Sequence, residues 1–312
     1  MAQCYNFTIV MNRKLSIKVP ATSANMGPGF DCLGIALDIW NKVSVMDSDD
    51  SESRVLVIGN GESELSYGTD NLVFQGFSRL FNVIGRQIPN VIIECENKIP
   101  LSRGMGSSSA ALVGGLYAAN TYAERPLNDS ELLKLAADME GHPDNVSPAL
   151  LGGMQIGIYD DGALVTAGVP IPENLSAVLF VPNVPMPTKE ARDILKSRVD
   201  RSDAVYNIGR AAMMVQAMIT GRLDYLRYAT QDKLHQPDRQ KVFFPMNNII
   251  RAAMACGALG AFLSGSGSTI LAFCTERQYA IGYEMADAGV KSGLDGEVII
   301  TRPTYLGAHI VD

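Results

Sequence analysis

The chain has 312 residues, of which 47% are hydrophobic and 19% are charged, and its formal net charge at neutral pH is −7. A chain of this length and composition can bury a large core, so we expect a folded protein of two domains or one large domain. The negative charge argues against nucleic acid as the main partner, because no overall positive field would attract phosphates.

The sequence shows no sign of export or of a membrane span. Residues 1–19 include basic residues and no long apolar run, so we do not expect a signal peptide, and no later segment is apolar for the length of a membrane helix. Wide spacing without a CxxC pair favours reduced thiols in the cytoplasm over a disulfide framework or a zinc site. The cysteines are Cys4, Cys32, Cys95, Cys256 and Cys274.

The first half of the chain mixes strands and helices. A predicted strand at 15–19 ends at Pro20, and a predicted helix at 69–85 is capped by Thr69 or Asp70 and stopped by Gly85. A Gly/Ser loop then opens a helix rich in small residues. The other elements predicted in this half are strands at 40–47, 53–60, 90–100 and 149–159, and a helix at 128–141.

The second half continues with a strand at 175–183 and a helix from Lys189 that Thr188 is expected to cap. Further predicted elements are a helix at 203–220, a strand–turn–strand at 257–274 and a last strand at 297–305. Clusters of adjacent strands beside helices indicate the α+β class. The proline-rich zone at 170–187 predicts a boundary between two domains, residues 1–172 and residues 173–312.

The segment RGMGSSSAAL at 103–112 has the features of an anion site at a helix start. Gly104 and Gly106 would let the backbone approach a phosphate, and free N–H groups with the helix dipole favour an anion. Ser107, Ser108 and Ser109 add hydroxyls for phosphate oxygens or Mg²⁺. The segment lacks the lysine of a Walker loop. The alternative is a serine-capped core helix after a glycine turn.

Two other glycine-rich segments are either parts of a binding site or simple turns. PATSANMGPGFDCLG at 20–34 is not a Rossmann fingerprint, because Cys32 stands where the third glycine belongs. Its Asn25 and Asp31 would suit a polar substrate with a hydroxyl and a cation, or they would simply hydrogen-bond their own turn. LSGSGSTI at 263–270 is a hairpin turn or a glycine wall.

Several charged residues stand in unusual places. Glu140 ends a predicted helix, where a carboxylate opposes the dipole, so a role as a Mg²⁺ ligand or a solvated helix end would explain it. Arg192 lies in the predicted first turn of its helix, where a cation needs an anionic partner such as a substrate carboxylate. Arg239, in a proline loop, is a second such group or a surface arginine.

Together these segments resemble the GHMP kinase superfamily, and within it the homoserine kinases. The resemblance covers most of the chain. It rests on residues 20–34, PLSRGMGSSSA (100–110), EGHPDNVSPALLGG (140–153), TKEAR (188–192), QPDR (236–239) and the GSG of residues 265–267. It implies an N-terminal ribosomal-protein-S5-like domain with a left-handed βαβ unit and a C-terminal ferredoxin-like domain.

The resemblance also implies roles on the side of the phosphate donor. ATP and Mg²⁺ would be the cofactors, Ser108 and Glu140 would bind the metal, with Ser107 as the alternative to Ser108, and Asn71 would lie near the adenine. Residues that would contact the nucleotide are Asn71, Pro100, Leu101, Ser102, Arg103, Gly104, Met105, Gly106, Ser107, Ser108, Ser109 and Ala110.

On the acceptor side the resemblance implies L-homoserine, phosphorylated on its hydroxyl. Arg192 and Arg239 would hold its carboxylate, Asp31 or Asp144 its ammonium, and Asn25 with Asp31 would orient the hydroxyl. Residues with implied catalytic roles are Asn25, Asp31, Asp144 and Arg192, and those implied to bind substrate also include His142, Thr188 and Arg239. We name no general base.

The resemblance further implies a cleft between two domains and a homodimer, while the charge and the apolar pattern already lead us to expect no nucleic-acid or membrane partner. The alternatives are another GHMP kinase that acts on mevalonate or a sugar, and a non-catalytic nucleotide-binding relative. The arginines and Asp31 distinguish an amino-acid substrate from mevalonate, because a zwitterion uses both charges while mevalonate has no ammonium. The serine loop and Glu140 argue against a non-catalytic relative.

Overall fold

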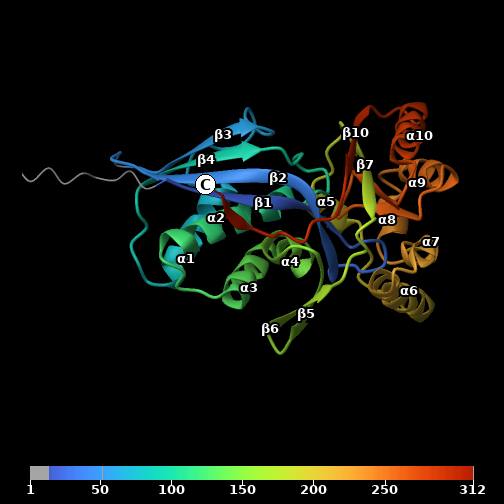
Figure 1. The fold of residues 1–312 in the computed structure, drawn as a ribbon, viewed down its shortest axis with the longest axis horizontal. Helices are drawn as coiled ribbons and strands as arrows, with labels where there is room; N and C mark the ends of the chain where they lie inside the picture. The colour runs from blue at the N-terminus through green and yellow to red at the C-terminus, as the bar shows by residue number, and fades with distance from the viewer. Residues whose placement is uncertain (1–13, 51, 312) are drawn as a thin grey trace, which may run out of the picture.

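The computed structural model describes residues 14–50 and 52–311 (Figure 1), so Cys4 and most of the segment tested for a signal peptide lie outside it. The chain forms a seven-stranded sheet and a four-stranded sheet. Helices α1 (Leu72–Val83), α2 (Ser107–Tyr122), α3 (Asp129–Glu140) and α4 (Pro143–Leu151) lie on one face of the larger sheet. This arrangement confirms the α+β class.

The larger sheet is mostly antiparallel and has the strand order β11–β1–β2–β4–β3, with β5 paired to β2 and β6 paired to β5. One pair is parallel: β3 and β4 are joined by a crossover through α1. The strands are β1 (Lys14–Ala24), β2 (Leu33–Asp47), β3 (Arg54–Gly59), β4 (Val91–Asn97), β5 (Met154–Asp160), β6 (Ala163–Val169) and β11 (His309–Val311).

The first strand does not end at Pro20, as predicted, but continues to Ala24. The register between β1 and β2 shifts between Pro20 and Ala21. Proline cannot donate to the ladder, and a bulge at that position lets the strand continue. The glycine-rich segment therefore begins inside a strand and leads into β2 at Leu33, which fixes both its ends.

Three helix boundaries differ from the prediction. Asn71 caps α1 by accepting a hydrogen bond from the N–H of Val73, whereas Thr69 or Asp70 was expected. Residues 143–151 form α4, although part of this segment was predicted as strand, and Pro143 at the helix start is the signal for it. In α5 (Thr188–Asp193), Thr188 is the first helical residue and does not cap.

The smaller sheet has the strand order β10–β7–β9–β8 and is antiparallel throughout. Its strands are β7 (Ser176–Pro182), β8 (Gly260–Leu263), β9 (Ile270–Cys274) and β10 (Gly296–Thr301). With α9 (Met246–Ala255) between β7 and β8 and α10 (Gln278–Lys291) between β9 and β10, the connectivity is that of a ferredoxin-like fold, which confirms that expectation.

The predicted domain boundary falls in the connection between β6 and β7 and stays a prediction. The chain then crosses back, because β11 pairs with β1 of the larger sheet. The remaining helices are α6 (Arg201–Thr220), η1 (Leu223–Tyr225), α7 (Leu226–Ala229) and α8 (Gln236–Arg239). The four cysteines of the described residues are free thiols. Among the described helices, none has the length and apolar character to cross a membrane.

Candidate active site

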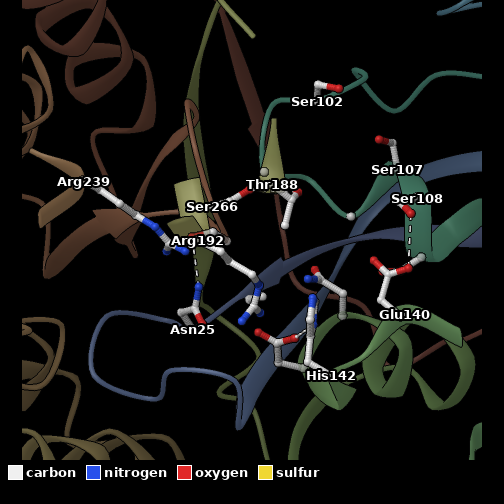
Figure 2. Close-up of a pocket in the computed structure, with 17 residues that line it drawn as sticks. Asn25, Ser102, Ser107, Ser108, Glu140, His142, Thr188, Arg192, Arg239 and Ser266 are labelled. Atoms are coloured by element: carbon white, nitrogen blue, oxygen red, sulfur yellow. Dashed lines mark hydrogen bonds and ion pairs between the residues drawn. The ribbon is translucent and has the colours of Figure 1, made fainter. Parts of the chain in front are cut away.

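A cleft lies where loops of the two sheets meet, and the three glycine-rich segments line it (Figure 2). The hydroxyl of Ser264, which is fully buried, donates to the carbonyl of Gly104 at 2.6 Å and hydrogen-bonds to the hydroxyl of Ser23 at 2.8 Å. The Asn25 amide donates to the carbonyl of Gly265 at 2.9 Å. Segments that the sequence separates by more than 150 residues are thus hydrogen-bonded at one point.

The loop before α2 requires its glycines. Gly104 and Gly106 both have positive φ, and a Cβ at these positions would stand 2.1 Å from the Ser264 carbonyl and 1.9 Å from the Thr22 hydroxyl. Among the described residues no side chain caps α2, so the N–H groups of its first turn face the cleft without a side-chain acceptor. Such a helix start is suited to bind an anion.

Arg103, in the same loop, points away from the cleft. Its guanidinium donates to three backbone carbonyls, those of Leu101, Pro182 and Asn183, at 2.7–2.8 Å. Two of these carbonyls belong to the end of β7 and the residue that follows it. Arg103 therefore fastens the loop to the smaller sheet. Met105 and Ala110 are also turned inward, because both side chains lie in the core.

Glu140 accepts hydrogen bonds from two serines of the loop, from Ser109 at 2.9 Å and from Ser108 at 3.2 Å. The carboxylate ends α3, against the helix dipole, and these two hydroxyls compensate for its unfavourable position. Ser107 lines the same side of the cleft. A carboxylate and a hydroxyl oxygen side by side are the hard ligands that Mg²⁺ takes, so the residues present fit this ion.

A second cavity, of about 420 Å³, adjoins the cleft at Ser102, Ser107 and Ser108. Asn71 contributes to its wall, together with Val57, Leu65 and other residues. The Asn71 side chain is also the cap of α1 and donates to the carbonyl of Ser66 at 2.7 Å. A cavity of this size is adequate for a nucleoside.

On the other side of the cleft Arg192 and Asp31 form a bidentate ion pair, with N–O distances of 3.0 and 2.6 Å. This contact raises the pKa of Arg192. Arg192 lies in the last turn of α5, not in the first turn as predicted, because the helix is short. Its guanidinium carbon lies 5.5 Å from the centre of the Phe30 ring. The anionic partner expected for Arg192 is therefore present within the chain.

Asn25 and His142 both line the cleft, and hydrogen bonds fix the position of each side chain. The Asn25 side-chain oxygen accepts from the N–H of Asp31 at 3.0 Å, so its amide braces the loop on both sides. His142 Nδ1 lies 2.5 Å from a carboxylate oxygen of Asp144, which is 2% exposed. Although burial opposes it, this contact raises the pKa of His142. Ligand atoms of Asp31, His142 and Asp144 lie within 4.8 Å of one another.

Arg239 is buried, with 1% of its surface exposed, so the alternative of a surface arginine is wrong. Its guanidinium donates to the carbonyls of Ala191 and Gly265 and to Nδ1 of His235. Burial lowers the pKa of Arg239 to about 10, so the group remains charged at neutral pH. Arg239 and Arg192 both line the cleft, on the side opposite Ser108 and Glu140 (Figure 2).

The cleft brings together most of the residues singled out in the sequence. Those that line it are Asn25, Ser102, Gly104, Gly106, Ser107, Ser108, Ser109, Glu140, His142, Asp144, Thr188, Arg192 and Arg239. Asp31 reaches it through Arg192, and Asn71 belongs to the adjoining cavity. Ser264, Ser266 and His235 were not predicted. The histidine in HQPDR was the available signal, because it stands four residues before a charged group.

Comparison with known proteins gives a consistent result. Models of the GHMP kinases N terminal domain and of the GHMP kinases C terminal match residues 71–153 and residues 214–291. A homoserine kinase of Carboxydothermus hydrogenoformans is 39% identical over 94% of this chain and 95% of the relative, and one of Synechocystis is 41% identical over 90% and 93%. The crystal structure of a homoserine kinase from Cytophaga hutchinsonii has a TM-score of 0.88 at 29% identity, and the match covers 99% of this chain and 100% of that one.

The contacts of Arg103 predict an effect on stability. The substitution Arg103→Met keeps an unbranched apolar stem and removes the donor to three carbonyls, so the ligand-free protein should lose about 1–3 kcal/mol in its free energy of unfolding. Urea denaturation measures this loss. Arg54→Met removes an arginine whose ion pair is exposed and serves as the control. Equal stability of the two variants would show that Arg103 does not fasten the loop.

Proposed function

The chain belongs to the GHMP kinase family and groups with its homoserine kinases, and we propose that it transfers the terminal phosphoryl group of ATP to the side-chain hydroxyl of L-homoserine. The observation that supports this most strongly is the content of one cleft. An uncapped helix start with Glu140 lies on one side, and an arginine–aspartate pair lies on the other. The first suits a nucleotide and the second an amino acid.

The nucleotide would bind across the two adjoining cavities. The adenosine part occupies the cavity beside Asn71, and the phosphates extend past Ser102 to the N–H groups at the start of α2. Gly104 and Gly106 allow this approach because neither has a side chain in the path. Met105 and Ala110 act through their backbone only, since their side chains are buried.

Ser108 and Glu140 would hold Mg²⁺ at the phosphates. The 3.2 Å contact between their oxygens supports Ser108 over Ser107, the alternative left open by the sequence. When bound, the metal neutralises charge on the transferred group. Ser109, which is fully buried, keeps the Glu140 carboxylate directed toward the cleft through its own hydrogen bond.

The acceptor would replace the internal ion pair of Arg192 and Asp31. A zwitterionic amino acid offers a carboxylate to Arg192 and Arg239 and an ammonium to Asp31, so each charged group exchanges one partner for another of the same sign. Asp144, close to Asp31, adds to the negative potential at the ammonium. Thr188 and Ser266, whose hydroxyls lie 3.3 Å apart, complete the wall at this end.

Bound in this way, the substrate directs its hydroxyl toward the start of α2. Its oxygen forms the new bond to phosphorus, the bond from phosphorus to the ADP oxygen breaks, and the hydroxyl proton passes to solvent water, since no general base is assigned. Catalysis of this transfer depends mainly on positioning and charge. Asn25 contributes by bracing the loop that carries Asp31, and Asp144 by orienting His142 beside the substrate.

The acceptor proposal is tested by measuring ADP release with L-homoserine, L-threonine, mevalonate and galactose. We expect turnover with homoserine well above that with the other alcohols. Mevalonate and galactose have no ammonium to match Asp31, and threonine matches both charges but carries its hydroxyl on the β-carbon, one bond closer to the charged groups than the hydroxyl of homoserine. Faster turnover with mevalonate or galactose would instead support the alternative of another GHMP kinase. Absence of turnover together with tight ATP binding would support a non-catalytic relative.

Arg192 supplies a second test. The substitution Arg192→Ala should raise the KM for homoserine about 10- to 150-fold, the loss expected for a charge-assisted hydrogen bond. The KM for ATP should change by less than about twofold, because Arg192 lies on the acceptor side. Steady-state kinetics with each substrate varied in turn measures both. Equal rises in the two constants would indicate that the arginine is structural.

We further propose that the enzyme serves threonine biosynthesis in the cytoplasm, as a homodimer. The free thiols of the described cysteines support a reducing compartment. One face of α6 supports the dimer. Val205 and Ile208 lie one turn apart on it and Ile219 lies three turns further along, and these side chains are 62%, 69% and 54% exposed. Beside it, within the described part of the chain, β6 pairs only with β5 and carries no charged residue.

A second copy of the chain suits this surface because the surface carries no acidic residue. Two molecules with a net charge of −7 repel each other, and a helix face and strand edge without carboxylates keep that repulsion away from the contact. Light scattering should therefore report a dimer for the native chain and a monomer for Ile208→Asp. Tyr283→Asp, on α10, is the control, since Tyr283 is 71% exposed elsewhere. A monomeric native chain, or a dimer broken by the control alone, would refute this surface.

A further inference from the structure

His235 stands directly behind the acceptor side of the cleft and is fully buried. It is the residue before α8, the short helix that ends with Arg239. Its Nδ1 lies 2.9 Å from a guanidinium nitrogen of Arg239, and its Nε2 lies 2.7 Å from the carbonyl oxygen of Gly27. One imidazole thus links a proposed substrate arginine to the glycine-rich loop of residues 20–34.

The two contacts determine the protonation state and the tautomer of the His235 ring. A guanidinium can only donate, so Nδ1 must be the acceptor and must be unprotonated. Nε2 then carries the hydrogen and donates it to Gly27. The nearest carboxylate, of Asp232, is 3.5 Å from Nε2 and already accepts from the N–H groups of Leu234, His235 and Gln236. Burial lowers the pKa of His235, which agrees with a neutral ring.

The His235 ring is linked to both arginines of the cleft, to Arg239 by a hydrogen bond and to Arg192 through the ring of Phe30. The guanidinium nitrogen of Arg239 that donates to His235 also donates to the carbonyl of Gly265 at 2.9 Å, so its direction is fixed. Phe30 packs against His235 with 5.4 Å between ring centres. The guanidinium carbons of Arg192 and Arg239 lie 5.5 and 5.8 Å from the centre of the same Phe30 ring. Movement of His235 would therefore displace both cationic groups.

We propose that His235 is a positioning residue for the amino-acid substrate. Through Arg239 it fixes the place of the carboxylate, and through Gly27 it fixes the loop that carries Asp31, the partner of the ammonium. The neutral ring is thus a spacer that sets the distance between the two binding groups of a zwitterion. This inference rests on the proposed function.

Three substitutions separate the two contacts. His235→Leu removes both. His235→Asn places an amide oxygen near the position of Nδ1 and can still accept from Arg239, whereas His235→Gln places an amide nitrogen near the position of Nε2 and can still donate to Gly27. Each amide variant therefore keeps one of the two links, and each is polar enough to satisfy part of the buried site.

The test is steady-state kinetics of these variants with homoserine and ATP varied separately. We expect His235→Leu to raise the KM for homoserine about five- to tenfold, with smaller rises for the two amide variants, and the KM for ATP to stay within about twofold. His309→Leu is the control and should change neither constant, because His309 lies in the edge strand β11 and does not line the cleft. An unchanged homoserine KM in every folded variant, or an equal rise in both constants, would overturn the proposal.

A double variant tests the route through Arg239. His235→Gln keeps the link to Gly27 and loses the one to Arg239, so, if His235 acts by fixing this arginine, His235→Gln combined with Arg239→Lys should be no more than about twofold worse than Arg239→Lys alone. Independent effects that multiply would contradict the link. If the native enzyme does not phosphorylate homoserine, the proposed function fails. If it does phosphorylate homoserine, but the His235 variants keep the native KM for homoserine, then only the inference about His235 fails.

Discussion

The site depends on one hydrogen bond, which the hydroxyl of the fully buried Ser264 donates to the carbonyl of Gly104. Ser264 follows β8 of the smaller sheet, and Gly104 precedes α2, which covers the larger sheet. A polar group buried without a partner is costly, so this contact fixes how closely the two loops approach. Gly104 and Gly265 have no side chains, and their backbones can therefore lie against each other.

The two sides of the cleft, which meet at this contact, carry different chemical groups. The side of α2 offers backbone N–H groups and a carboxylate held by serines, which suits phosphates and a divalent cation. The side of α5 and α8 offers two arginines and two aspartates. Between Arg192 and Asp31 the charges cancel, so neither is buried without a counter-charge while no substrate is bound. The proposed zwitterionic substrate would preserve this balance on replacing the internal pair.

The parts of the site that depend on local chemistry could be predicted from the sequence. Gly104, Gly106 and the serines after them indicated an anion site, because helix starts have the same unsatisfied groups in every protein. Glu140 was noticed because its position opposes the helix dipole. Local apolar patterns predicted most strands, and clusters of adjacent strands beside helices predicted the α+β class.

What could not be predicted depends on distant parts of the chain. Arg192 and Asp31 are 161 positions apart, and no local pattern shows that they pair. Arg239 sits in a polar segment that gives no sign of burial, although it is almost completely covered. The role of His235 arises only when Gly27 is brought against it. The helix α4 was missed because Pro143, Asp144 and Asn145 are as common in turns as in first helical turns.

Displacement of the Arg192–Asp31 pair by a zwitterion beside bound nucleotide is tested most directly by a crystal structure with L-homoserine and a non-hydrolysable ATP analogue. We predict the pair opened, the carboxylate between Arg192 and Arg239, the ammonium at Asp31, and the hydroxyl directed at the terminal phosphate near Ser108. An intact pair, with homoserine bound elsewhere or with its hydroxyl turned away from the phosphate, would contradict the account.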